Sequence, residues 1–177
     1  MPMHERDLES LITRLPDGDL EALEALYREF HHAVYSYSLL ILHNQDLAHD
    51  NTQDVFMRIW DKRSTYRAGG NPRAWMMSIT HNLACDRLRR SAREVSLDEL
   101  PDAAPAADSR VLLQSIERLD LQSALNTLAQ DIRQIVLLKA VAGLPARDVG
   151  QLLGLPPSTV QWRYRRALKS LAELLEV

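Results

Sequence analysis

A stretch of about 20 residues beginning at Asn71 constrains the fold more than any other part of the chain. Asn71 can cap a helix, and Pro72 suits a first turn, where its missing N–H costs nothing. No proline or glycine interrupts the residues that follow, so we predict one helix to about Ala92. The apolar pattern predicts that one side of this helix is buried. That side carries Met76, Ile79, Leu83 and the stem of Arg87.

The opposite side of the same helix has an unusual composition for a solvent-facing stripe. It carries Trp75, Ser78, Asn82, Cys85 and Arg89. An aromatic plane, an amide and a guanidinium are groups that hold unstacked bases beside a phosphate backbone. The alternative is a core tryptophan next to a solvated basic end, and this helix alone does not separate the two interpretations.

Helical periodicity also runs through most of the remaining chain. It predicts helices at residues 5–15, 20–42, 47–63, 111–128, 131–142, 147–153 and 157–176. Between Glu94 and Ser109 the period is lost, and two prolines, four alanines and an acidic excess replace it. We therefore expect an all-α chain of two small helical domains, residues 1–94 and 110–177, joined by a flexible linker at residues 95–109. About 20 fully extended residues reach about 65 Å, which is about two turns of DNA.

The predicted helix at residues 47–63 has two different faces. Its buried side consists of Ala48, Thr52, Val55, Phe56 and Ile59, whereas Asp50, Asp54 and Asp61 lie opposite, beside Gln53 and Met57. The acidic side is either a solvated face or a docking surface for a basic partner, with Met57 and Trp60 as apolar anchors. In the preceding helix we assign Leu20, Leu23, Leu26, Tyr27, Phe30, Val34 and Tyr37 to the core.

The last two predicted helices form a helix-turn-helix, because a short helix, a turn at Gly154 and a longer helix opened by Pro156-Pro157 follow one another. The inward stripe of the final helix is Val160, Tyr164, Ala167, Leu168, Leu171 and Leu175. Its outward stripe is Ser158, Gln161, Trp162, Arg165, Arg166 and Lys169. Polar and basic side chains near the start of such a helix can read base edges in a major groove.

Charge and composition exclude several classes of protein. The formal net charge is -3, whereas a free-standing DNA-binding protein usually has a strong basic excess. If the chain binds nucleic acid, another molecule therefore supplies much of the affinity. Cys85 is the only cysteine, and no nucleophile motif, phosphate loop or metal-ligand spacing occurs, so we expect no enzyme, cofactor or metal. No signal peptide or apolar run of about 20 residues is present, which predicts a cytoplasmic protein without membrane insertion.

Four segments resemble the extracytoplasmic-function (group four) sigma factors of bacterial RNA polymerase. The segments Asp46–Asp50 and Gln53–Trp60 resemble the polymerase-docking segment of that family, and Arg73–Trp75 with Asn82–Arg90 looks like its promoter-melting helix. Gly18–Phe30 fits the first region, and the stretch from Gly143 to Ala167 is similar to the C-terminal helix-turn-helix. The resemblance covers nearly the whole chain in the family's order. Asn51-Thr52 replaces aliphatic residues of the family, and Trp162 stands where small residues are common.

The resemblance implies a role for each surface. Residues that would dock on the clamp helices of the largest polymerase subunit are Asp46, Asp50, Gln53, Asp54, Phe56, Met57 and Trp60. Residues that would hold the melted minus-ten strand are Tyr66, Arg67, Asn71, Ser78, Asn82, Arg87, Arg89 and Arg90, with Asn82 beside a flipped base and Trp75 as structural support. Residues that would read the minus-thirty-five duplex are Ser158, Thr159, Gln161, Trp162, Arg165, Arg166 and Lys169.

The partners that the resemblance implies are core RNA polymerase, including its flap, promoter DNA and an anti-sigma factor that covers both domains. The regulon would answer stress or envelope signals. The alternative function is a stand-alone helix-turn-helix repressor or activator. That alternative leaves the N-terminal half unexplained and predicts a more basic chain.

Overall fold

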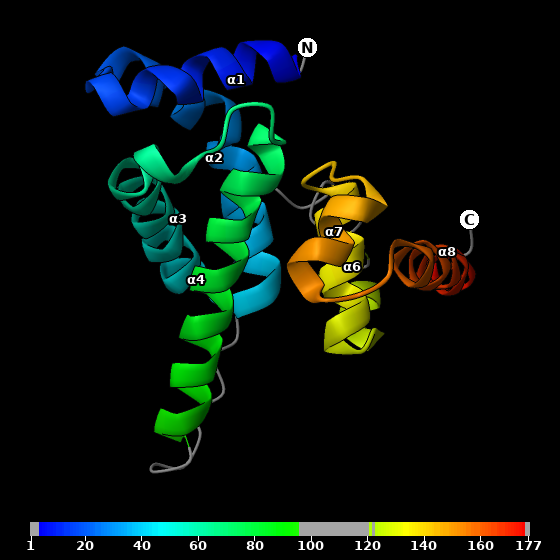
Figure 1. Ribbon diagram of the computed structural model, residues 1–177. Coiled ribbons are helices and arrows are strands. Elements are labelled where there is room, and N and C mark those ends of the chain that lie inside the picture. Colours follow the sequence, from blue (N-terminus) through cyan, green and yellow to red (C-terminus); the bar gives the residue numbers. More distant parts are fainter. Residues whose placement is uncertain (1–3, 96–120, 122, 176–177) are drawn as a thin grey trace.

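The computed structural model describes residues 4–95, 121 and 123–175, and it is all-α over these residues. Its helices are α1 (Glu5–Arg14), α2 (Leu20–Leu42), α3 (Gln45–Asp61), α4 (Pro72–Val95), α6 (Gln130–Ala140), α7 (Ala146–Leu153) and α8 (Pro157–Leu174), with short 3₁₀ turns η1 (Leu15–Asp17) and η2 (Arg63–Thr65) (Figure 1). The expected all-α class and the C-terminal helix-turn-helix are confirmed. The predicted linker lies outside the described residues except for residue 95, where α4 ends.

The N-terminal domain is built from α1 to α4 around one apolar core. Its buried residues include Leu8, Ile12, Leu26, Phe30, Val55, Ile59, Met76 and Ile79. Side-chain caps set where its helices begin: the side chain of Asp19 accepts from the Ala22 N–H at 2.9 Å, and that of Asn44 accepts from the Leu47 N–H at 2.9 Å. Helix α3 packs against both α2 and α4, and α3 and α4 lie side by side (Figure 1).

Asn51 and Thr52, the two polar residues of α3 at apolar positions, are buried with hydrogen-bond partners. Asn51 Nδ2 donates to Ser38 Oγ at 2.9 Å, and Thr52 Oγ1 donates to the carbonyl of Ala48 at 2.7 Å. A buried polar group costs free energy unless it is hydrogen-bonded. These bonds offset the cost of burying Thr52 and the amide nitrogen of Asn51, whereas Asn51 Oδ1 is buried with no partner among the described residues.

The helix-turn-helix depends on two glycines with different roles. Gly154 ends α7 with φ of 68°, a left-handed conformation that favours glycine. A Cβ added at Gly150 would stand 2.5 Å from the carbonyl oxygen of Leu155, so only glycine lets the turn fold back on α7 this closely. Val160, Ala167 and Leu171 anchor α8 in the core as predicted, but Leu168 is 42% exposed and does not belong to the inward stripe.

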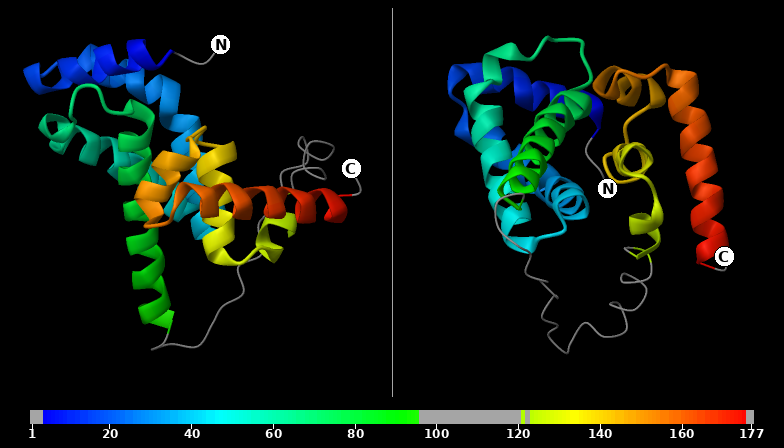
Figure 2. Two further views of the ribbon diagram at one scale, coloured as in Figure 1. Left: turned by 45° about the vertical axis from the view of Figure 1, so that its right-hand side comes forward. Right: turned by 90° about the horizontal axis from the view of Figure 1, so that it is seen from below.

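The two domains pack against each other along α2 and α4. Figure 2 places α6 and α7 beside α4, and its right-hand view shows α8 farther away; contacts join α2 to α6 and α4 to α7. One apolar cluster accordingly contains Tyr37, Ile41, Met77 and Ala84 from the first domain together with residues of α6 to α8. Because the second domain covers this side, α4 is buried on two faces rather than the single face that its periodicity predicts.

Candidate nucleic-acid interface and docking groove

A cavity of about 500 Å³ lies at the N-terminal half of α4. It is lined by Thr65, Tyr66, Arg67, Gly70, Asn71, Ala74, Trp75, Ser78 and Asn82 from the first domain and by Asp148, Gln151 and Leu152 from α7. Five of the residues predicted to hold the melted strand therefore meet around one space. Amide, hydroxyl, guanidinium and aromatic groups side by side can hold an unstacked base.

The loop that closes this cavity is held by its own hydrogen bonds. The hydroxyl of Tyr66 donates to the carbonyl of Gly70 at 2.9 Å, and the Gly70 N–H donates to the carbonyl of Arg67 at 3.0 Å. Asn71 then caps α4 by accepting from the Ala74 N–H at 3.1 Å. The loop is thus ordered before any ligand arrives, which lowers the conformational cost of binding.

The side chains around the cavity differ in whether their aromatic or polar groups can contact a ligand. Trp75 is half-buried against the N-terminal core and meets the edge of Tyr66 with ring centroids 5.6 Å apart, so it forms a wall rather than a free platform. The hydroxyl of Ser78 donates to the carbonyl of Trp75 at 2.7 Å. Asn82 is exposed on the same side of α4, which leaves its amide accessible to a base edge.

The three predicted phosphate-binding arginines lie farther along α4 and do not line the cavity. Arg87 forms an ion pair with Asp54 of α3, and Arg89 pairs with Asp86 at 3.0 Å, while Arg90 is exposed. The first pair joins a predicted strand-binding residue to a predicted docking residue. Periodicity within one helix could not predict this contact, because the two residues lie on different helices.

An apolar groove of about 460 Å³ runs between α2 and α3. It is lined by Leu20, Leu23, Tyr27, Gln53, Phe56, Met57, Trp60 and Asp61. Met57 is 66% exposed and Leu20 is 65% exposed, so this surface can bury apolar area against a partner. Asp46, Asp50 and Asp54 are exposed on α3 outside the groove and give its surroundings an acidic character.

The predicted burial of Phe56 is confirmed at this groove, whereas the core assignment of Leu20 and Tyr27 is wrong. Phe56 is only 7% exposed and packs on Tyr27, with ring centroids 4.8 Å apart, so it is mainly a core residue that forms part of the floor. Leu20 and Tyr27 were expected in the core, yet Tyr27 is 43% exposed. Both residues lie beside the buried stripe of α2, which runs through Ala22, Leu26 and Phe30. The unusual width of the apolar face of α2 is the signal that could have indicated their exposure.

The outward face of α8 carries the residues predicted to read duplex DNA. Ser158, Trp162, Arg165, Arg166 and Lys169 are exposed, and Thr159 and Gln161 are half-buried. The guanidinium carbon of Arg166 lies 5.5 Å from the centroid of the Trp162 ring, and both side chains border a cavity of about 370 Å³ against α6. Arg163, on the flank of α8, pairs with Asp131 at 2.6 Å and ties α8 to α6.

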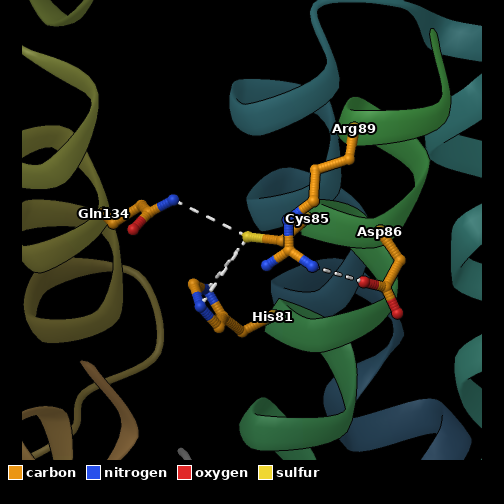
Figure 3. A network of polar contacts seen from close by, with 5 residues as sticks. All are labelled: His81, Cys85, Asp86, Arg89 and Gln134. Carbon is orange, nitrogen blue, oxygen red and sulfur yellow. Dashed lines mark hydrogen bonds and ion pairs between the residues drawn. The ribbon is translucent and has the colours of Figure 1, made fainter. Parts of the chain in front are cut away.

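Cys85, for which the sequence suggested no role, lies at the contact between the domains. Its Sγ is 3.7 Å from Gln134 Nε2 of α6 and 3.7 Å from the ring nitrogens of His81 (Figure 3). His81 is buried and its Nδ1 lies 2.8 Å from the hydroxyl of Tyr37. Burial raises the pKa of the Cys85 thiol and lowers the pKa of His81, so both groups favour their neutral forms.

Acidification is expected to destabilise this packing. Burial, and then Arg133, lowers the pKa of His43, and burial, and then Arg89, lowers that of His81. A histidine with a lower pKa in the folded state contributes stability above its unfolded pKa of about 6.5, and that stability is lost as the pH falls below this value. The midpoint of thermal unfolding should therefore drop between pH 7.5 and 5.5.

Arg133 faces the imidazole of His43. The groups that face the imidazole of His81 are Tyr37, Cys85 and Arg89. The double variant His43→Asn/His81→Gln cannot titrate at these positions and should show a smaller drop in the same scan. A parallel fall of the wild-type and variant midpoints would assign the pH dependence to other groups.

Comparison with known proteins identifies both domains. The family model described as sigma-70 region 2 matches residues 26–94, and the model described as sigma-70, region 4 matches residues 118–171. An ECF RNA polymerase sigma factor SigK of Mycobacterium sp. (strain KMS) is 26% identical over 183 residues, covering 99% of this chain and 94% of that protein. SigK of Mycobacterium ulcerans (strain Agy99) is 28% identical over 189 residues, covering 99% and 97%.

A solved structure shows the same arrangement of helices. The sigma factor RpoE of Bartonella quintana, in complex with the anti-sigma factor NepR, superimposes with a TM-score of 0.74 at 26% identity. The match covers 87% of this chain and 96% of that one.

Proposed function

We propose that this chain, which carries both sigma-70 regions, is an extracytoplasmic-function sigma factor of RNA polymerase whose surfaces share promoter recognition. The domain at residues 1–94 docks on core polymerase and separates the strands at the minus-ten element. The domain at residues 110–177 binds the minus-thirty-five element as duplex, and residues 95–109 link the two. The observation that supports this division is the separation of an apolar groove on α2 and α3 from a cavity on α4 whose lining combines polar and apolar groups.

Docking uses the groove and its acidic surroundings. Met57 and Trp60, with Leu20 and Tyr27 from α2, supply the apolar contact area, and Gln53 adds a polar group at the groove. Asp46, Asp50 and Asp54 favour a basic partner surface such as the clamp helices, because charge complementarity speeds association and fixes orientation. Phe56 supports the groove from below.

Strand separation uses the cavity on α4. A base of the non-template strand leaves the stack and enters between Tyr66, Asn71 and Asn82. Arg67 borders the same space, and Arg87, Arg89 and Arg90 follow the phosphates along the continuing helix. Melting of this kind needs no catalytic step, because binding the single strand shifts the equilibrium toward the open duplex.

The C-terminal domain reads duplex DNA through α8. Its first turns present Ser158, Thr159, Gln161 and Trp162, and Arg165, Arg166 and Lys169 follow on the exposed side. The indole of Trp162 offers an apolar face for a thymine methyl group, which a small residue at this position would not provide.

The remaining functional assignments follow from the family. The chain acts without catalysis and without a cofactor, in the cytoplasm, on genes that answer stress or envelope signals. No helix among the described residues is long and apolar enough to cross a membrane. The relative RpoE was solved with an anti-sigma factor, and we infer an anti-sigma partner for this chain as well. The flap of core polymerase is the further partner of the C-terminal domain.

Transcription in vitro tests the proposed function directly. Purified chain and core polymerase are incubated with a library of promoter fragments, and transcripts are sequenced. Specific start sites that require the added chain are expected, preceded by common minus-ten and minus-thirty-five elements. Tight, specific binding of promoter duplex by the chain alone, with no stimulation of core polymerase, would instead identify a stand-alone regulator.

A further inference from the structure

Helix α1 lies against the loop that closes the cavity on α4, although it precedes residues 26–94, which the sigma-70 region 2 model matches. Leu8 and Ile12 are fully buried in the N-terminal core, so α1 is fixed against α2 and α4. Figure 1 and Figure 2 both show the chain between η2 and α4 passing beside α1. Helix α1 is therefore placed to hold this loop as well as to complete the core.

One side chain of α1 makes the contact with the loop. Glu9 follows the buried Leu8 and is half-buried, and its Oε1 accepts a hydrogen bond from the Gly69 N–H, 60 residues away in the sequence. Gly69 has a φ of 82°, a left-handed conformation that favours glycine. A hydrogen bond with an ionised acceptor is stronger than one between neutral groups. The bonds of Tyr66 and Gly70 close the loop on itself, whereas Glu9 joins its tip to α1.

Glu9 also acts on an aromatic side chain of the cavity. Burial, and then the charge of Glu9 and its hydrogen bond, raises the pKa of the Tyr66 hydroxyl. The hydroxyl therefore keeps its proton, which it donates to the carbonyl of Gly70 at 2.9 Å. The ring of Tyr66 borders the cavity and packs on Trp75. Glu9 is thus close to both the backbone and the aromatic ring that give the loop its shape.

The charge of Glu9 is the wrong sign for a direct contact with DNA. A carboxylate repels phosphates at close range. The lining of the cavity described above includes Tyr66, Arg67 and Gly70 but not Glu9. The bond to Gly69 gives the carboxylate a purpose that a strand contact does not.

We propose that Glu9 is a positioning residue, whose hydrogen bond to Gly69 holds the loop from Tyr66 to Asn71 at the spacing from α4 that fits one unstacked base. This inference rests on the proposed function of the cavity. A loop that is already held in its binding conformation loses less conformational freedom when the base enters. The N-terminal helix thereby contributes to promoter opening without touching the DNA.

The rate of open-complex formation by variant holoenzymes tests this role. Loss of one charge-assisted hydrogen bond in Glu9→Ala should slow opening by about three- to tenfold, with unchanged affinity for core polymerase. The amide oxygen of glutamine can still accept from the Gly69 N–H, so Glu9→Gln should retain most of the wild-type rate. Asp7→Ala, the matched control, removes an exposed carboxylate from the same helix and should change neither measurement.

Abasic promoter fragments assign the effect to the base that enters the cavity. The probe is a fluorescent fragment with a single-stranded minus-ten region, taken from the transcription library, with an abasic site at each position in turn. At the position where loss of the base weakens binding of the wild-type holoenzyme most, the wild type and Glu9→Ala should bind equally. At the other positions the weaker binding of Glu9→Ala should persist. A general structural role would weaken binding by the same factor at every position and would overturn the proposal.

Amide hydrogen exchange of the free chain, followed by NMR, reports the bond itself. The Gly69 N–H should exchange slowly in the wild type and in Glu9→Gln, and at least about threefold faster in Glu9→Ala. Equal opening rates of the wild type and Glu9→Ala, or equal slowing in the alanine and glutamine variants, would overturn the proposal. Faster opening in both variants would also overturn it, because the carboxylate would then only repel phosphates. Failure of the wild-type holoenzyme to open any library promoter would overturn the proposed function instead, and exchange at Gly69 would still report the contact.

Discussion

Replacing Met57 with aspartate is expected to lower the affinity of the chain for core RNA polymerase by about 30-fold or more. Met57 is 66% exposed and borders the apolar groove between α2 and α3, so its side chain is available to a partner. Loss of a central apolar anchor at an interface costs about 2 kcal/mol or more, and a carboxylate buried in its place adds a desolvation penalty. Fluorescence anisotropy with labelled core polymerase measures the change.

Met57→Leu is the matched control for this variant. Leucine keeps apolar volume in the groove and should retain most of the affinity. The thermal stability of both variants should equal that of the wild type, because the position is exposed. Unchanged affinity of the aspartate variant would show that the groove does not face polymerase.

Replacing Asn82 with alanine is expected to slow open-complex formation by about 10- to 100-fold while core polymerase binding stays unchanged. The exposed amide of Asn82 borders the cavity on α4 and can donate to and accept from one base edge. A paired amide-to-base contact contributes about 1–3 kcal/mol, or about 5- to 150-fold in rate, and the expected loss lies within this range. Permanganate reactivity of unpaired thymines, followed over time, measures opening.

The isosteric variant Asn82→Asp distinguishes hydrogen bonding from shape. It keeps the volume of the side chain and loses both amide donors, so it should be at least as slow as alanine. Equal losses of opening and of polymerase binding in either variant would indicate a misfolded α4 rather than a lost base contact.

Asp54 is a poor choice for testing docking alone. Its carboxylate pairs with Arg87 of α4, so an arginine at position 54 would place two cations together and also disturb a predicted phosphate contact. A variant at this position would impair docking and strand binding together. Met57 and Asn82 lie on separate surfaces and avoid this coupling.

The helices and the helix-turn-helix were predictable because each depends on neighbouring residues. Proline at helix starts, glycine in the turn after Leu153 and one apolar stripe per helix are local signals. The outward position of Asn82 was identified in the same way, whereas Tyr66, Arg67 and Asn71 were implied by the family resemblance; the structure brings these residues together at one cavity. Their roles in DNA binding stay predictions.

The features that were missed depend on packing between distant parts of the chain. Met77 and His81 lie off the apolar stripe expected for α4, yet both are buried in the structure. No periodicity within a single helix can indicate a second buried face that another domain creates. The exposure of Leu20 and Tyr27 was missed for the opposite reason, since apolar character predicts burial and cannot show that a groove stays uncovered.

The packing of α3 on α4 has a consequence for where transcription begins. Val55 and Ile59 of α3 share one core with Met76 and Ile79 of α4, so the helix proposed to dock on polymerase and the helix proposed to bind the strand move as one body. With these proposed roles, the packing of α3 on α4 would set the distance from the enzyme surface to the first unpaired base. We infer that the packing of α3 on α4 fixes the position of the upstream edge of the transcription bubble relative to the polymerase active site.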